Sequence, residues 1–136
     1  QPIWQERIHK AGEKGMEAQV EETMERWFTQ PFLRQNSPMV KLIRQQILAT
    51  PVAGYTGCAE AIRRLNYLDQ ISAIKIPTLI IVGEDDPGTP VSASEAMHER
   101  IPDSKLVVLP SARHLSNVEQ TEVFNASLLS FLKNRP

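Results

Sequence analysis

The sequence places acidic side chains and a histidine shortly after two apolar runs. The run Thr78–Val82 is followed by Gly83-Glu84-Asp85-Asp86, and the run Leu106–Leu109 is followed, within one short loop, by His114. A carboxylate that accepts a hydrogen bond from an imidazole Nδ1–H fixes the tautomer of the ring and leaves Nε2 free to take a proton from a nucleophile. These residue types could therefore carry out general base catalysis.

Both apolar runs are predicted to be strands of one parallel sheet. They are short, continuous and rich in β-branched residues, which is typical of strands buried on both faces. A helix is predicted between them, from Thr89-Pro90 to about Arg100, so that the whole reads as a βαβα unit with two parallel strands. Because the carboxyl ends of parallel strands meet at one edge of a sheet, an acid of the first loop and His114 are expected to lie close together.

A last helix is predicted after His114. Ser116-Asn117-Val118-Glu119 fits a capping box, in which the side chains at its two ends satisfy each other's backbone N–H groups. The apolar positions of this helix include Val123, Phe124, Leu128, Phe131 and Leu132.

Spacing alone does not choose among Glu84, Asp85 and Asp86 as the partner of His114. A loop rich in carboxylates, Pro and Gly is also typical of a solvated turn. His9 and His98 stand among charged helical neighbours, as surface histidines do. These loops do not identify a nucleophile.

The first half of the chain reads as helices. Apolar residues recur at helical spacing from Met16 to Phe28, and Pro31 is expected to end that helix. Ser37-Pro38 and Thr50-Pro51 each predict the start of a further helix, because a capping residue precedes a proline. The second of these helices is expected to carry Tyr55, Cys58 and Ile62 on one side. The boundary is placed at Ile76-Pro77, which separates a helical part, residues 1–75, from the βαβα part, residues 76–136.

The composition argues against several classes of function. The chain has 15 Lys and Arg against 16 Asp and Glu, a net charge of −1, so no surface for nucleic acid or anionic lipid is expected. The single cysteine, Cys58, rules out an intrachain disulfide and a multi-cysteine metal site. The apolar runs are far shorter than the roughly 18 residues that span a bilayer. No leader pattern is visible, so a cytoplasmic location is expected.

Both loops resemble those of the α/β-hydrolases. The similar stretches are Ile76–Gly83, Asp86-Pro87-Gly88-Thr89-Pro90 and His114-Leu115-Ser116-Asn117-Val118-Glu119-Gln120. More narrowly, the helical half is similar to the cap of the 3-oxoadipate enol-lactonases at Trp4–Ile8, Glu25–Phe28 and Ala49–Cys58. The resemblance implies the C-terminal part of an α/β-hydrolase, a helical cap (or lid) followed by the last part of the sheet.

The resemblance also implies roles for single residues. Asp86 corresponds to the triad acid, since in the family the acid directly precedes this Pro-x-Thr-Pro, and His114 corresponds to the triad base. Trp27 falls where the cap supplies an aromatic wall over the substrate. Arg113 stands where a small residue is expected, and could steer an anionic lactone or point to solvent. The implied reaction opens the lactone ring of 3-oxoadipate enol-lactone to 3-oxoadipate through a serine nucleophile, with no metal or organic cofactor.

The family's nucleophile motif, Gly-x-Ser-x-Gly, does not occur in this sequence. The triad order in the family is Ser, acid, His, so the serine and the earlier strands are expected to precede Gln1, which is not a Met. The chain is therefore expected to be inactive alone. It is also expected to associate through an exposed strand edge, either with the missing N-terminal half of the hydrolase core or with a second copy.

Other interpretations stay open. An esterase, a non-haem haloperoxidase, a dehalogenase or a C–C bond hydrolase would share the two loops. A non-catalytic interaction domain, whose helical half binds a partner, is an alternative from a different class. A phosphoacceptor module fits less well, because no lysine-bearing strand follows Glu84-Asp85-Asp86 in the expected order.

Overall fold

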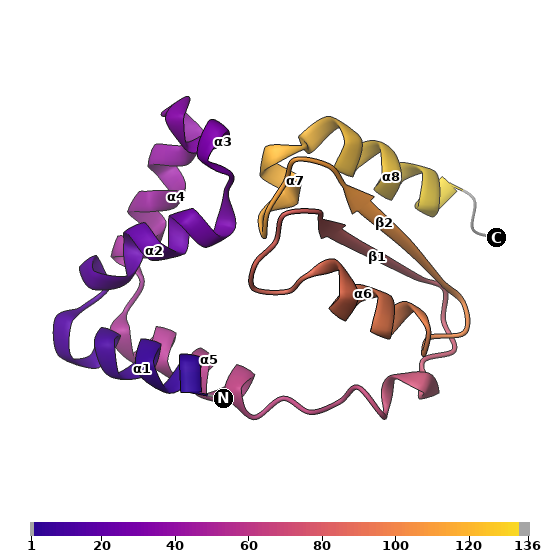
Figure 1. Cartoon of the computed structure of the whole chain (residues 1–136), viewed down its shortest axis with the longest axis horizontal. Coiled ribbons are helices and arrows are strands. Elements are labelled where there is room, and N and C mark those ends of the chain that lie inside the picture. Colours follow the sequence, from indigo (N-terminus) through magenta and orange to yellow (C-terminus); the bar gives the residue numbers. More distant parts are fainter. Residues whose placement is uncertain (1, 134–136) are drawn as a thin grey trace. The chain divides into compact units, whose positions relative to one another are not determined.

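The computed structural model describes residues 2–133. Its helices and strands, in chain order, are α1 Pro2–Lys14, α2 Glu17–Trp27, α3 Gln30–Arg34, α4 Pro38–Ala49, α5 Val52–Arg63, a 3₁₀ turn Ile71–Ala73, β1 Thr78–Gly83, α6 Val91–His98, β2 Ser104–Leu109, α7 Ser116–Glu119 and α8 Thr121–Lys133 (Figure 1). The chain forms two compact units. No helix among the described residues is both long and apolar enough to cross a bilayer.

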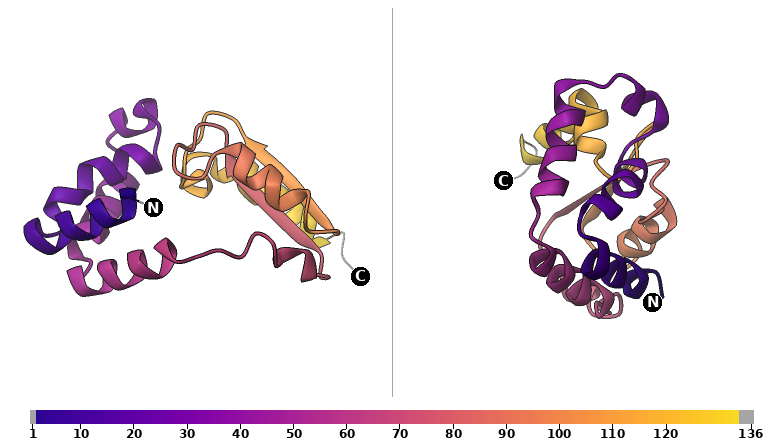
Figure 2. Two further views of the ribbon diagram at one scale, coloured as in Figure 1. Left: turned by 60° about the horizontal axis from the view of Figure 1, so that its bottom comes forward. Right: turned by 90° about the vertical axis from the view of Figure 1, so that its left-hand side faces the viewer.

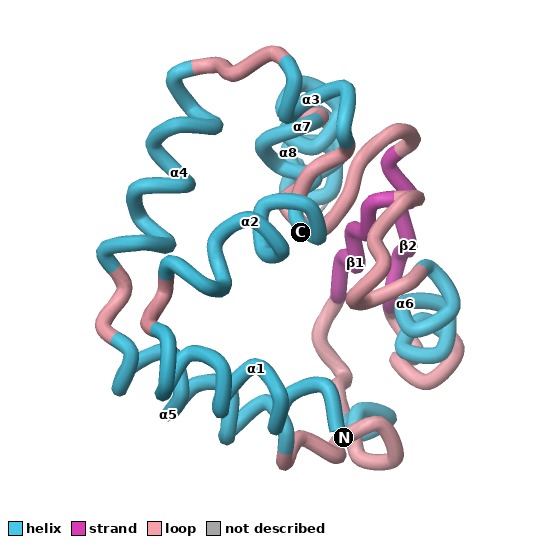
Figure 3. Tube along the Cα trace, turned by 60° about the vertical axis from the view of Figure 1, so that its left-hand side comes forward, coloured by secondary structure: helices cyan, strands magenta, loops and turns pink. Residues whose placement is uncertain are grey.

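The first unit is helical and consists of the residues up to Glu25 together with Leu33–Asn66. Helices α1 and α5 lie side by side in it (Figure 3). Ser37 caps α4, because its Oγ accepts a hydrogen bond from the backbone N–H of Val40 at 3.3 Å, as the sequence predicts. The apolar core of this unit comprises Ala11, Met16, Val20, Met24, Val40, Ile43, Ile47 and Ala59.

One expectation about these helices is wrong. Helix α2 ends at Trp27, and Pro31 does not end it. Pro31 lies in the first turn of α3, where backbone N–H groups have no partner within the helix, so that proline loses no hydrogen bond there. In α5 the buried residue is Ala59. Of the three residues expected on one side of α5, Tyr55 is half-buried, whereas Cys58 and Ile62 are exposed.

The second unit contains the predicted βαβα arrangement. Strands β1 and β2 pair in parallel, from Thr78 opposite Ser104 to Gly83 opposite Leu109, which confirms the predicted fold class. Helices α6 and α8 each contact both strands and lie on opposite faces of the sheet (Figures 1 and 3). The parallel pairing brings the loops after β1 and β2 to the same end of the sheet.

The chain after His114 differs from the single capped helix that was expected. A short helix, α7, precedes α8, and Leu115 at its start makes no side-chain capping bond. Helix α8 buries none of its residues completely, and Val123 and Leu132 are 46% and 57% exposed. A sheet of two strands covers only part of the apolar face of such a helix.

A segment from the first half of the sequence belongs to the second unit. Residues 26–32, at the end of α2 and the start of α3, cluster with the chain from Tyr67 onward. Within this segment Phe28 is fully buried and stacks on Phe32, with ring centroids 5.2 Å apart. The division at Ile76-Pro77 and the role of residues 1–75 as a cap remain predictions.

Candidate active site

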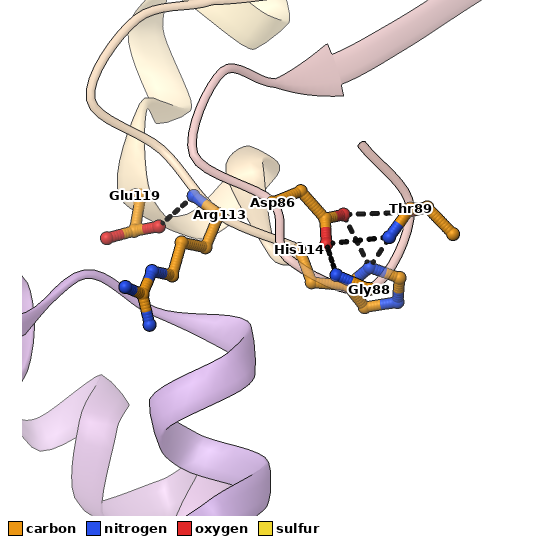
Figure 4. A network of polar contacts seen from close by, with 6 residues as sticks. All are labelled: Asp86, Gly88, Thr89, Arg113, His114 and Glu119. Atoms are coloured by element: carbon orange, nitrogen blue, oxygen red, sulfur yellow. Dashed lines mark hydrogen bonds and ion pairs between the residues drawn. The ribbon is translucent and has the colours of Figure 1, made fainter. Parts of the chain in front are cut away.

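The loops after β1 and β2 come together at one end of the sheet (Figure 2), and Asp86 and His114, one from each loop, meet there (Figure 4). Oδ2 of Asp86 lies 2.8 Å from Nδ1 of His114. The Asp86 side chain is 4% exposed and the His114 side chain 44%. An ionised carboxylate only accepts hydrogen bonds, so Nδ1 carries the proton and Nε2 keeps its lone pair. The pair thus has the tautomer that a general base needs.

Asp86 also accepts hydrogen bonds from its own loop. Oδ1 accepts the backbone N–H groups of Gly88 at 2.8 Å and Thr89 at 3.0 Å, and Oδ2 accepts the Thr89 hydroxyl at 2.6 Å (Figure 4). Burial raises the pKa of Asp86, but the hydrogen bonds from Thr89, His114 and Gly88 outweigh it and hold the pKa below its ordinary value. The carboxylate is therefore kept ionised beside the imidazole.

The neighbouring carboxylates do not take this position. Glu84 and Asp85 are exposed, and it is their backbone N–H groups that bond to the other loop. Glu84 donates to the carbonyl of Leu109 at 2.9 Å, and Asp85 donates to that of Ala112 at 2.9 Å. The two loops are thus joined along their backbones, and the turn directs only Asp86 toward His114.

Gly83 allows this close approach. A Cβ at this position would lie 2.3 Å from the carbonyl oxygen of Arg113 and 2.4 Å from that of Ala112. Both are backbone atoms that cannot move aside cheaply, so only glycine fits. From the sequence, Gly83 is expected only as the residue that ends a strand. The reason that it must be glycine is its contact with the backbone of the other loop.

The loop that carries His114 turns at Ser111. Ser111 has a φ of 53°, in the left-handed region that residues other than glycine and asparagine seldom adopt. The amide of Gln120 donates to the carbonyl of Pro110 at 3.0 Å and stabilises the start of this loop.

Trp27 lies beside His114. The indole and imidazole rings stack with their centroids 6.4 Å apart and their planes at 25°. The backbone carbonyl of Trp27 accepts a hydrogen bond from the N–H of Leu115 at 3.1 Å. All three candidate site residues, Asp86, His114 and Trp27, are therefore brought together in the second unit.

Glu119 is a site residue that sequence reasoning missed. Its carboxylate accepts hydrogen bonds from the N–H of Arg113 at 2.6 Å and from the N–H and hydroxyl of Thr29 at 2.7 and 2.6 Å (Figure 4 shows the first). The capping-box prediction gave this carboxylate a partner within its own turn; no local pattern points to Thr29. Arg113 itself is half-buried.

The other histidines make surface contacts. His9 lies 3.3 Å from Glu13 on α1, and His98 Nδ1 lies 2.8 Å from the Ser104 hydroxyl. Among residues 2–133, no three His, Cys, Asp or Glu side chains gather as metal ligands would.

Comparisons with known proteins agree with this geometry. Residues 4–121 match the family model of the alpha/beta hydrolase fold. The 3-oxoadipate enol-lactonase 2 of Acinetobacter baylyi is 33% identical over 130 residues, which cover 96% of this chain and 48% of that protein. The crystal structure of the enol-lactonase from Burkholderia xenovorans matches with a TM-score of 0.94 at 28% identity, over 98% of this chain and 51% of that one.

A thermophilic esterase from Thermogutta terrifontis is also similar, with a TM-score of 0.86 at 30% identity, over 98% of this chain and 51% of that one. The chain spans about half the length of the relatives it matches. The family model covers most of the chain, and the relative from Acinetobacter baylyi is 33% identical over 96% of it: the chain belongs to the α/β-hydrolase family.

Proposed function

We propose that Asp86 and His114 are the acid and the base of a serine-hydrolase triad that opens 3-oxoadipate enol-lactone to 3-oxoadipate. The observation that carries the proposal is the buried Asp86 carboxylate 2.8 Å from Nδ1 of His114, at the end of two parallel strands. The choice of an enol-lactone as substrate is supported by the 33% identity to the enol-lactonase of Acinetobacter baylyi.

The proposed reaction runs in two halves. A serine hydroxyl attacks the lactone carbonyl while Nε2 of His114 takes its proton, and the ring C–O bond breaks to give an acyl-enzyme and an enolate. The enolate takes up a proton from the imidazolium and becomes the ketone. Water, deprotonated by His114, then releases 3-oxoadipate and restores the serine. The ionised Asp86 stabilises the imidazolium in both halves.

The serine must come from outside these 136 residues, because they hold no Gly-x-Ser-x-Gly motif. We propose that the rest of the hydrolase core supplies it, together with the oxyanion donors. A largely apolar surface on the second unit suits such a contact. Leu79, Val107 and Phe131 help to line an open groove of about 380 Å³ between the sheet and α8, and Leu132, which follows Phe131 in the sequence, is exposed. A second copy of this chain is the competing occupant of that surface.

Trp27 is proposed to bind substrate. Its partly exposed indole lies beside the base, where the flat enol-lactone ring could stack on it. The helical part, residues 1–75, is proposed to act as the cap.

A carboxylic ester is the second candidate substrate. The esterase of Thermogutta terrifontis is 30% identical to this chain, and ester and lactone hydrolysis use the same triad chemistry. The two differ in the leaving group, which stays tethered to the acyl group only when a lactone opens.

One experiment tests the proposal. The complete open reading frame that encodes this chain is expressed, and its turnover of the enol-lactone and of simple aryl esters is compared in wild type, Asp86→Asn and the matched control Asp85→Asn. Asp86→Asn should lower kcat by about 10⁴, as in other triads, while Asp85→Asn changes it little. An open reading frame without Gly-x-Ser-x-Gly, or equal activity of wild type and Asp86→Asn, would contradict the proposal.

A further inference from the structure

We propose that Glu119 is a positioning residue for His114. Its carboxylate fastens residues 26–32 to the loop that carries the base, and so holds the indole of Trp27 against the imidazole. That Glu119 matters for turnover rests on the proposed function. That Glu119 holds Trp27 beside His114 does not depend on it.

The Glu119 carboxylate receives donors from two distant segments. Oε1 accepts both the N–H and the hydroxyl of Thr29, and Oε2 accepts the N–H of Arg113, all within 2.7 Å. Thr29 lies 90 residues before Glu119 in the sequence, whereas Arg113 directly precedes His114. Short hydrogen bonds to an ionised acceptor are the strong kind, and two of these donors are backbone groups whose positions fix the course of the chain.

These contacts enclose His114 between two fixed neighbours. On one side the N–H of Arg113 is held by Glu119, and on the other the N–H of Leu115 is held by the carbonyl of Trp27 at 3.1 Å. Trp27 and Thr29 in turn flank the fully buried Phe28. The backbone on both sides of the base is therefore tied to residues 27–29, which also supply the ring that stacks on it.

A glutamine cannot reproduce this arrangement. The carboxylate accepts on both oxygens, whereas an amide accepts on its oxygen alone and turns an NH₂ group toward the other donor. Glu119→Gln therefore keeps the size of the side chain but must release either Thr29 or Arg113. If Glu119 were only a helix cap, its carboxylate would accept a hydrogen bond from the N–H of Ser116 at the start of α7. Its hydrogen bonds instead come from Thr29 and Arg113, outside this helix.

The stacking can be measured without substrate. A protonated imidazole in contact with indole quenches its fluorescence. The chain has two tryptophans, so Trp4→Phe leaves Trp27 as the only tryptophan. Histidine is the side chain whose unperturbed pKa places its change of charge between about pH 5 and pH 8. Asp86, the charged group on Nδ1, has a lowered pKa and stays ionised over that range. Trp27 emission should therefore fall on acidification, and His114→Gln should abolish the fall, which separates His114 from His9 and His98.

In this background Glu119→Gln should reduce the fall in emission at least about two-fold. The matched control Glu122→Gln, at an exposed carboxylate three residues further on, should keep it. Thr29→Val removes only one of the three donors and should reduce the fall in emission by an intermediate amount. If Glu119→Gln does not fold, Thr29→Val tests the proposal in its place. Two results would overturn the proposal. One is a fall in Trp27 emission that survives His114→Gln. The other is a fall that keeps its full size in folded Glu119→Gln or, if that variant does not fold, in Thr29→Val. No turnover enters this readout, so it stands or falls separately from the proposed reaction.

Discussion

Gly83 and Arg113 are in contact through their backbones: the carbonyl oxygen of Arg113 occupies the place where a side chain at residue 83 would begin. This contact joins the end of β1 to the residue next to His114. The distance between the acid loop and the base loop is thus set by the lack of a Cβ at one position.

Gly83→Ala should disturb the site and the stability together. The added methyl would overlap two carbonyl oxygens, and overpacking of this kind costs about 1–3 kcal/mol of the free energy of unfolding. Urea titration measures this cost. The matched control is Gly57→Ala in α5, where nothing lies within 4 Å of the new Cβ, and it should stabilise the chain by about 0.5–1 kcal/mol. Equal effects of the two variants would show that residue 83 does not limit the approach of the loops.

Asp86 should make stability depend on pH in the acid range. Its pKa is lower in the folded chain than the ordinary value of 3.8, so the folded state holds the proton less tightly than the unfolded state. The resulting stabilisation is fully present above that value and is lost as the pH falls through the lower, folded pKa. The difference in free energy of unfolding between wild type and Asp86→Asn should accordingly shrink in acid. A difference that stays constant below pH 3.8 would contradict this.

Thr89→Val should shift that acid dependence toward higher pH. The hydroxyl donates to Oδ2 of Asp86 at 2.6 Å, and this bond is one of the causes of the lowered pKa. Without it the pKa of Asp86 moves back toward its ordinary value, so acid unfolding should begin at a higher pH. Thr56→Val, at an exposed hydroxyl bonded within α5, is the control and should leave the midpoint where it is.

Ser111→Gly should stabilise the chain. Ser111 has a φ of 53°, a conformation that costs a side-chain-bearing residue about 1 kcal/mol and glycine almost nothing. The gain appears as a higher denaturant midpoint. Asn36→Gly, at a φ of 47°, should gain less, because asparagine tolerates this region better than serine. A loss of stability in Ser111→Gly would argue that the serine side chain contributes more than its backbone strain costs.

The parallel sheet and the meeting of its two loops could be predicted from the sequence. The run Thr78–Val82 is continuous and β-branched, and an intervening helix leaves parallel pairing as the simple solution. Spacing could not choose Asp86 over Glu84 and Asp85. The choice depends on how the turn folds back, so that the N–H groups of Gly88 and Thr89 face one carboxylate.

Long-range partners account for what local patterns could not predict. Ser116-Asn117-Val118-Glu119 has the sequence of a capping box, yet the Glu119 carboxylate bonds to Thr29, far away in the chain. The apolar positions of α8 can be read from the sequence, but how far they are buried depends on how much sheet lies opposite them. Periodicity is a local property, and in both cases the outcome is set by the neighbours.

The central claim is that the Asp86 carboxylate holds the proton on Nδ1 of His114. Proton NMR of the chain near neutral pH tests it directly, since an imidazole N–H bonded to a carboxylate resonates far downfield of the amide protons. We expect such a resonance in the wild type and in Asp85→Asn, and its disappearance in Asp86→Asn and His114→Gln. A folded wild-type chain without this resonance, or an Asp86→Asn variant that retains it, would contradict the claim.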